Sequence, residues 1–201
     1  MKIQDVLISI DFIGTFVFAI TGASIGGKSN FDFFGMLFLA FLTAIGGGTI
    51  RDLIIGEPVF WTTEPTYLYL IFLAALSIFF LMKIYERWAR LLFFLDTLGV
   101  ATFVVIGTHK TLELGFNSET ALIMGTISAV LGGILRSAFS KEYSILYKKE
   151  LYATVAAAAS LLFIILRKSG LSLDLSIPIV IALTLTFRYL AVRFKIQLPT
   201  I

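Results

Sequence analysis

The feature that most constrains this chain is a run of three glycines, Gly46 to Gly48, inside a long apolar stretch. Glycine in a helix interior costs about 1 kcal/mol relative to alanine, so such a run marks either a kink or a close approach of two backbones. A related pair, Gly132 and Gly133, occurs 85 positions after Gly47 and Gly48. The same glycine-rich pattern therefore occurs twice in the chain.

The composition indicates a chain that is embedded in a lipid bilayer. Of its 201 residues, 58% are hydrophobic and 14% are charged, whereas a soluble domain has about 25% charged residues. The first apolar stretch carries no small-residue cleavage pattern, so we expect a retained span and no signal peptide. A span takes about 20 residues. We expect a single transmembrane domain over residues 1–201, with spans at 6–25, 33–55, 66–82, 91–108, 120–139, 151–166 and 175–192.

The 85-residue offset extends well beyond the glycines and needs no gap. It pairs Asp11 with Asp96, Phe18 with Phe103, Gly22 with Gly107, Arg51 with Arg136 and Tyr67 with Tyr152. Each unit contains three spans, and an odd number of spans inserts the second copy upside down. We predict an all-α membrane protein with seven transmembrane helices, arranged as two inverted three-helix repeats (about 6–84 and 91–168) and a seventh helix (about 174–193). Such repeats, with glycine-interrupted spans at matching positions, are typical of transport folds.

The glycines predict a pathway through the membrane. A helix that is broken there exposes backbone groups at membrane depth, which are tolerated only where protein or a water-filled cavity satisfies them. The alternative is that the glycines only allow neighbouring helices to pack closely. The repeat in inverted register favours the pathway, lined or kinked at Thr43, Gly46, Gly47, Gly48, Thr49, Ser128, Gly132, Gly133 and Ser137.

Four ionisable residues lie inside predicted spans at related positions. A span of 18 residues from Phe33 to Arg51 rises about 27 Å, so Arg51 reaches the same depth as Asp11, and inversion places Arg136 with Asp96 at the opposite side. An unpaired charge within the bilayer is costly. We therefore predict two ion pairs, Asp11 with Arg51 and Asp96 with Arg136, that serve as outer and inner gates. The alternative is that all four reach the headgroups separately. Asp52 also competes for Arg51, which favours the inner pair over the outer one.

The distribution of Lys and Arg predicts the orientation. With the N-terminus outside, eleven of them lie on the cytoplasmic side and five on the outer side. Because basic residues favour the cytoplasmic side, we expect an outside N-terminus and a cytoplasmic C-terminus in the inner or plasma membrane. At the cytoplasmic side Arg188, Arg193 and Lys195 are expected to anchor the last helix through headgroup contacts. The single histidine, His109, is expected to be solvated in a polar loop.

The residue types exclude several classes of function. The chain contains no cysteine and no set of residues for nucleophilic catalysis, and its single histidine has no partners for a metal. We expect no enzyme activity, no cofactor, no nucleic-acid partner and no metal other than permeant monovalent cations.

The segments 46–52 and 132–136 resemble glycine-rich motifs of the trimeric intracellular cation channel (TRIC) family, as do 57–61 and 149–153. The resemblance covers nearly the whole chain and is to the prokaryotic members, whose repeat domain is also described as a glycine transporter. It implies a homotrimer with one pore in each protomer, lined by kinked second and fifth helices and conducting potassium, sodium or other monovalent cations. The second copy departs from the first at two positions of the 85-residue repeat: Ser137 corresponds to Asp52, and Leu131 corresponds to Gly46.

Three functions are compatible with these patterns. The first is a monovalent cation channel, which needs weak polar contacts along a continuous path. The second is a secondary transporter for a small zwitterion such as glycine, which needs an occluded site and alternating access. The third is a membrane scaffold whose glycines serve packing alone.

Overall fold

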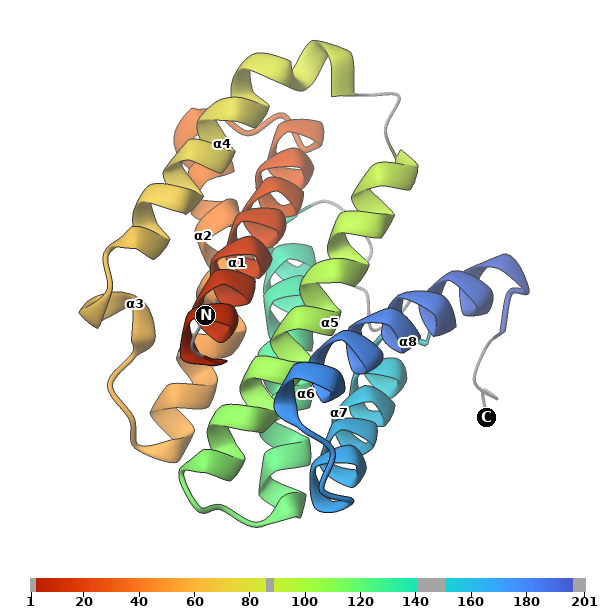
Figure 1. The fold of residues 1–201 in the computed structure, drawn as a ribbon. Coiled ribbons are helices and arrows are strands. Elements are labelled where there is room, and N and C mark those ends of the chain that lie inside the picture. The colour runs from red at the N-terminus through yellow and green to blue at the C-terminus, as the bar shows by residue number, and fades with distance from the viewer. Residues whose placement is uncertain (1–2, 86–88, 141–150, 197–201) are drawn as a thin grey trace.

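A computed structural model of the chain describes residues 3–85, 89–140 and 151–196, and these residues are almost entirely helical (Figure 1). The long helices alternate in direction along the chain, so α1 and α5 run in opposite directions. The helices are α1 (Ile3–Lys28), α2 (Phe33–Ile55), α3 (Phe60–Thr63), α4 (Thr66–Tyr85), α5 (Ala89–Glu113), α6 (Ser118–Phe139), α7 (Tyr152–Lys168) and α8 (Leu173–Arg193).

Each predicted span coincides with one helix to within a few residues. Helices α1, α2, α5, α6 and α8 are long and apolar enough to cross a membrane, and α4 contains a shorter apolar segment, Thr66–Leu81. Helix α7 has 17 residues. The short helix α3 was not predicted; it lies in the polar connection between α2 and α4 and begins at Phe60.

The predicted interruption of the second and fifth spans is wrong. Helix α2 runs unbroken through Gly46, Gly47 and Gly48, and α6 runs unbroken through Gly132 and Gly133. The helix cost of a glycine is small compared with the cost of leaving backbone groups without partners in a bilayer. The helices therefore keep their hydrogen bonds, and the glycines serve the contact between α2 and α6 described below.

The two halves of the chain pack their helices in matching ways. Helix α1 packs against α2 and α4, as α5 packs against α6 and α7, while α1 contacts α5 and α2 contacts α6 across the middle. The buried rings of Phe18 and Phe103, which are 85 positions apart, meet there with centroids 5.2 Å apart. Helix α8 packs on α5 and α7.

Helices α2 and α6 begin with the same kind of side-chain cap. Asp32 caps α2 by accepting from Gly35 N, and Asn117 caps α6 by accepting from Thr120 N, each at 2.8 Å. Both caps satisfy a backbone N–H that the first helical turn leaves free. Ahead of α4, Thr66 donates from Oγ1 and from its backbone N to Glu64, and these bonds hold the pKa of that carboxyl below its usual range.

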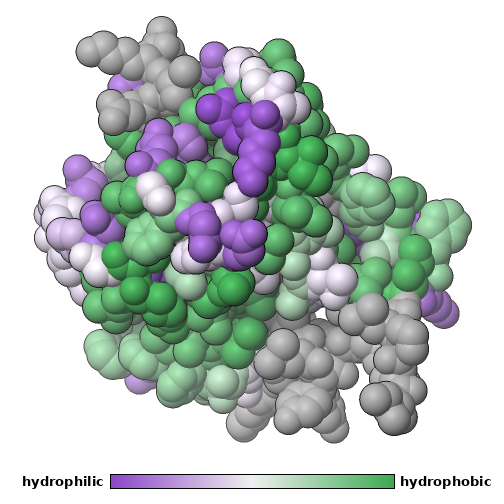
Figure 2. All heavy atoms as spheres, turned by 90° about the horizontal axis from the view of Figure 1, so that it is seen from below, coloured by the Kyte–Doolittle hydropathy of each residue, from purple (hydrophilic) through white to green (hydrophobic). Residues whose placement is uncertain are grey.

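The exterior is mainly hydrophobic. Viewed from the lower end of Figure 1, hydrophilic side chains form patches within a largely hydrophobic surface (Figure 2). Phe34, Phe80 and Phe187 are each at least 60% exposed. Such large apolar side chains are stable at a surface when lipid tails cover them. The fold thus presents many large apolar residues outward as well as in its core, and, as shown next, it buries several charges.

Candidate functional site: two buried charge clusters

The first cluster of buried charges surrounds Asp52, near the end of α2, whose side chain is fully buried. Its Oδ1 accepts from Arg51 Nε at 2.9 Å and from Lys110 Nζ of α5 at 2.8 Å. Its Oδ2 accepts from Phe60 N, at the start of α3, at 3.1 Å. One carboxylate therefore ties α2, α3 and α5 together.

Asp11 does not pair with Arg51, so this predicted ion pair is wrong. The Asp11 Oδ2 atom accepts from the hydroxyl of Tyr67 at 2.7 Å. The Tyr67 ring packs edge-on against Phe60, with centroids 4.6 Å apart. Arg51 pairs with its neighbour Asp52 instead, with Nη2 2.8 Å from Oδ1, because the adjacent carboxylate lies within reach of two guanidinium nitrogens.

The second cluster surrounds Asp96, near the start of α5. Arg136 of α6 donates from Nη2 to Asp96 Oδ1 at 2.9 Å, and from Nη1 to the hydroxyl of Thr21 at 2.8 Å. Arg188 of α8 donates from Nη1 to Asp96 Oδ2 at 3.0 Å. The structure thus brings together Asp96 and Arg136, as the depth argument predicts, and adds a second arginine. Each of these three charged residues is at most 8% exposed.

The burial of Arg188 corrects the prediction that it anchors α8 in the headgroups. Its guanidinium lies 4.6 Å from the ring centroid of Tyr152 and 5.1 Å from that of Phe93. Cation–π contacts of this kind stabilise a desolvated guanidinium by about 2 kcal/mol. Arg193 and Lys195 are exposed, and their role as headgroup anchors stays a prediction. The missed signal was an arginine inside an apolar span, which is a functional hypothesis by default.

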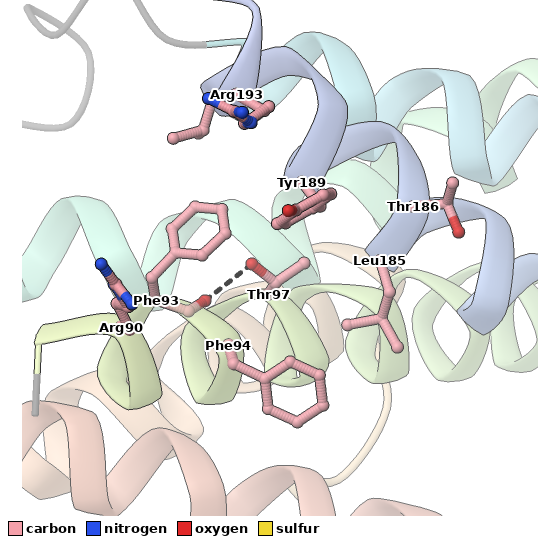
Figure 3. Close-up of a pocket in the computed structure, with 9 residues that line it drawn as sticks. Arg90, Phe93, Phe94, Thr97, Leu185, Thr186, Tyr189 and Arg193 are labelled. Carbon is pink, nitrogen blue, oxygen red and sulfur yellow. Dashed lines mark hydrogen bonds between the residues drawn. The ribbon is translucent and has the colours of Figure 1, made fainter.

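A groove of about 1010 Å³ runs between α5 and α8 beside the second cluster (Figure 3). Phe93 belongs to its wall and also stacks on Arg188. The hydroxyl of Thr97 faces back into α5 and donates to Phe93 O at 2.7 Å. The groove is lined by Arg90, Phe93, Phe94, Thr97, Leu185, Thr186, Tyr189, Val192 and Arg193.

The glycines bring α2 and α6 into backbone contact. A Cβ added to Gly47 would overlap the carbonyl oxygen of Ser128, and one added to Gly132 would overlap the carbonyl oxygen of Thr43. Since Gly47 and Thr43 stand 85 positions before Gly132 and Ser128, the two contacts are reciprocal. These glycines therefore allow α2 and α6 to pack closely, which is the alternative considered from the sequence.

The remaining predicted pathway residues lie around this contact. Gly46 faces the end of the Leu135 side chain, and Gly48 faces the ring of Phe60. Thr49 accepts from Trp61 Nε1 at 2.9 Å and donates to Ile45 O. Gly133 and Ser137 lie on α6, both buried, and Ser137 occupies the position that Asp52 has in α2.

Replacing Gly47 with alanine is expected to destabilise the protein, because the new methyl group meets a backbone carbonyl that cannot turn aside. Overpacking of this kind costs about 1–3 kcal/mol. Gly46→Ala is the matched control, since its methyl group meets only the flexible end of Leu135. The measurement is thermal unfolding of the purified variants in detergent. Equal stability of the two variants would contradict the contact at Gly47.

His109 is not in a polar loop, which corrects another prediction. Helix α5 continues to Glu113, and His109 lies within it, 8% exposed, with its ring edge-on to Phe163. Its Nε2 atom is 3.1 Å from Glu113 Oε1. No group of three or more His, Asp or Glu side chains that could hold a metal ion occurs among the residues the structure describes.

These observations define a class: a multi-pass α-helical membrane protein with two buried charge clusters at related positions. A model of the family described as "Glycine transporter" matches the chain twice, at residues 8–83 and 93–168, and the two matches begin 85 residues apart. The UPF0126 inner membrane protein YadS of Escherichia coli strain K12 is 34% identical over 194 residues, covering 95% of this chain and 94% of that protein.

Two solved structures share the fold over nearly the whole chain. One is a TRIC trimeric intracellular cation channel orthologue from Rhodobacter sphaeroides, with a TM-score of 0.90, 32% identity and coverage of 95% of this chain and 99% of that chain. The other comes from work on conductance through TRIC cation channels, with a TM-score of 0.88, 30% identity and coverage of 100% and 98%. The chain therefore belongs to the trimeric intracellular cation channel family, as a prokaryotic member whose repeat matches the glycine transporter model.

Proposed function

We propose that this protein is a potassium-type monovalent cation channel with a pathway inside each protomer, between two inverted repeats. The observation that carries the proposal is the placement of the charge clusters near opposite ends of α5. Asp96 and Lys110 are 14 positions apart on that helix, which corresponds to about 21 Å along its axis. Charged groups near both ends of a path, with weak polar contacts between them, suit ion conduction. The related structures are described as cation channels.

The pathway would run beside the contact between α2 and α6, past the glycines and small hydroxyl residues around it. Glycine backbone and small hydroxyl side chains offer weak contacts to a passing cation. The residues proposed to line it are Thr43, Gly46, Gly47, Gly48, Thr49, Ser128, Gly132, Gly133 and Ser137. The clusters around Asp52 and Asp96, with Asp11, Arg51 and Arg136, would act as the gates, and three protomers would assemble as a homotrimer.

The proposed topology has seven spans in the cell membrane, an outside N-terminus and a cytoplasmic C-terminus. The chain has no cysteine, so single cysteines report position directly. We expect Glu119→Cys, in the exposed first turn of α6, to react with a membrane-impermeant maleimide added to intact cells. Ile196→Cys, exposed after α8, should react only after the cells are opened. Labelling of Ile196→Cys in intact cells would contradict this orientation.

The function is tested with purified protein in planar bilayers and in liposomes. A channel gives single-channel current steps in potassium chloride, with a reversal potential that follows the potassium gradient. Current steps without saturable glycine uptake support the proposal. The matched protein for both assays is a heat-inactivated sample in the same lipid, because lipid defects alone can produce current.

The second candidate is a transporter for glycine, which the description of the matching family model favours. An inverted-repeat transporter also places its site between the repeats and needs an arginine to hold the substrate carboxylate. Saturable uptake of labelled glycine, with no current steps in bilayers, would support this candidate and overturn the channel.

A further inference from the structure

The hydroxyl of Tyr152 is buried without a hydrogen-bond partner among the described residues. Tyr152 is 3% exposed, and its ring lies beneath the guanidinium of Arg188. A buried hydroxyl without a partner is costly, so each such group in a folded protein calls for a reason. A reason is available in the first half of the chain, where Tyr67 holds the related position.

The aspartate near each tyrosine accepts hydrogen bonds from different donors in the two halves. Tyr67 donates its hydroxyl to Asp11 Oδ2 at 2.7 Å. Tyr152 stands 85 positions after Tyr67, as Asp96 stands after Asp11. In the second half, however, Asp96 Oδ2 already accepts from Arg188 Nη1 at 3.0 Å, and Oδ1 accepts from Arg136. In the second half, therefore, Arg188 donates to the carboxylate oxygen that corresponds to the one to which Tyr67 donates in the first half.

Arg188 belongs to α8, which packs on α5 and α7 and leaves much of its own surface uncovered. Helix α8 lies after the two repeats and has no counterpart in the first half. Of the five candidate spans it is the least buried, with 33% of its most apolar window buried against 44–67% for the others. The groove of about 1010 Å³ between α5 and α8 is lined in part by Phe93 (Figure 3), and the guanidinium of Arg188 lies over the ring of Phe93.

We propose that Arg188 is a latch on the Asp96 cluster. When α8 shifts away from α5, Arg188 leaves Asp96 for the groove, and the Tyr152 hydroxyl donates to the vacated oxygen, as Tyr67 does to Asp11. With the latch closed, both oxygens of Asp96 accept from arginine and are closed to a cation. With the latch open, one oxygen accepts from a neutral donor and is open to a cation. This step rests on the proposed channel function.

The first arm of the test measures open probability in planar bilayers. Arg188→Gln removes the charged hydrogen bond that closes the latch, and bonds of that kind are strong enough to change a two-state ratio by about tenfold or more. We expect open probability to rise by that factor. Lys195→Gln, exposed just after the same helix and not among the residues that line the groove, is the matched control and is expected to leave open probability unchanged. An unchanged open probability in Arg188→Gln would overturn the latch.

The second arm uses the tyrosines, whose replacement by phenylalanine keeps the ring. Tyr152→Phe removes an unpaired buried hydroxyl from the closed state and the needed donor from the open state. It is expected to raise thermal stability and to lower open probability several-fold. Tyr67→Phe removes an existing hydrogen bond and is expected to lower thermal stability. A loss of stability in Tyr152→Phe equal to that in Tyr67→Phe would overturn the proposal.

A third arm needs no conduction, so it separates failure of the latch from failure of the channel function. Phe94 of α5 and Tyr189 of α8 both line the groove, and both are exposed. Spin labels at Phe94→Cys and Tyr189→Cys report the spacing of α5 and α8. We expect Arg188→Gln to lengthen or broaden the measured distance distribution relative to the labelled parent. An identical distribution would overturn the latch even if the protein conducts.

Discussion

Replacing Asp96 with asparagine is expected to lower the unfolding temperature by roughly 10 °C, far more than replacing Asp11 with asparagine. Asp96 accepts from two buried arginines. Removing one partner of a buried pair costs about 3–5 kcal/mol, because a charge is left without compensation. In a chain of this size, 1 kcal/mol corresponds to about 2–4 °C. Asp11 accepts from the neutral hydroxyl of Tyr67, and an asparagine oxygen still accepts that bond.

The measurement is thermal unfolding of purified variants in one detergent. A double variant, Asp96→Asn with Arg188→Gln, supplies the internal check, because it also removes one of the uncompensated charges. We expect it to recover part of the loss seen in Asp96→Asn. Equal shifts in Asp96→Asn and Asp11→Asn would show that the two arginines do not depend on the carboxylate for their stability.

The sequence predicts the helices well because their signal is local. A long apolar stretch bounded by charged or turn residues forms a helix in lipid, where every backbone group must be satisfied within the segment. The meeting of Asp96 with Arg136 also followed from simple geometry, since rise per residue fixes depth along a helix. Depth alone, however, did not identify the partner of Arg51, because Asp52 lies at nearly the same depth and next to it in the chain.

The glycines show a second limit. A run of glycine is compatible both with a broken helix and with two helices in backbone contact, and the same residues serve either. The choice depends on what lies opposite, and the carbonyl of Ser128 opposite Gly47 is a contact between residues far apart in the sequence. Internal symmetry predicts such a contact only once the relative placement of α2 and α6 is known.

Arg188 shows a third limit. The 85-residue offset relates positions within the two repeats, and α8 lies beyond both. Symmetry therefore gave no partner for Arg188, and a count of basic residues placed it among the headgroup anchors. Its burial depends on the packing of α8 against α5 and α7, where Asp96 and the ring of Tyr152 are within its reach.

Replacing Asp52 with asparagine is expected to release α3 as well as to destabilise the fold. Asp52 is the common acceptor for Arg51, Lys110 and the backbone N of Phe60. Loss of its charge leaves Arg51 buried without a carboxylate, at a cost of about 3–5 kcal/mol. The bond to Phe60 N weakens too, since a charged acceptor binds a donor about twice as strongly as a neutral one.

Two measurements check this expectation. Thermal unfolding gives the global effect, and amide hydrogen exchange across residues 56–65 gives the local one, because few other bonds hold α3. Asp174→Asn is the matched control. Asp174 is exposed in the first turn of α8 and contributes chiefly through the helix dipole, which is worth about 0.3–1 kcal/mol. If exchange at 56–65 is as slow in Asp52→Asn as in the parent, the carboxylate is not what holds α3 in place. Faster exchange there, with the rest of α2 still protected, would show that the Asp52 cluster fixes the segment that covers Gly48 and Thr49, and with it the mouth of the proposed pathway.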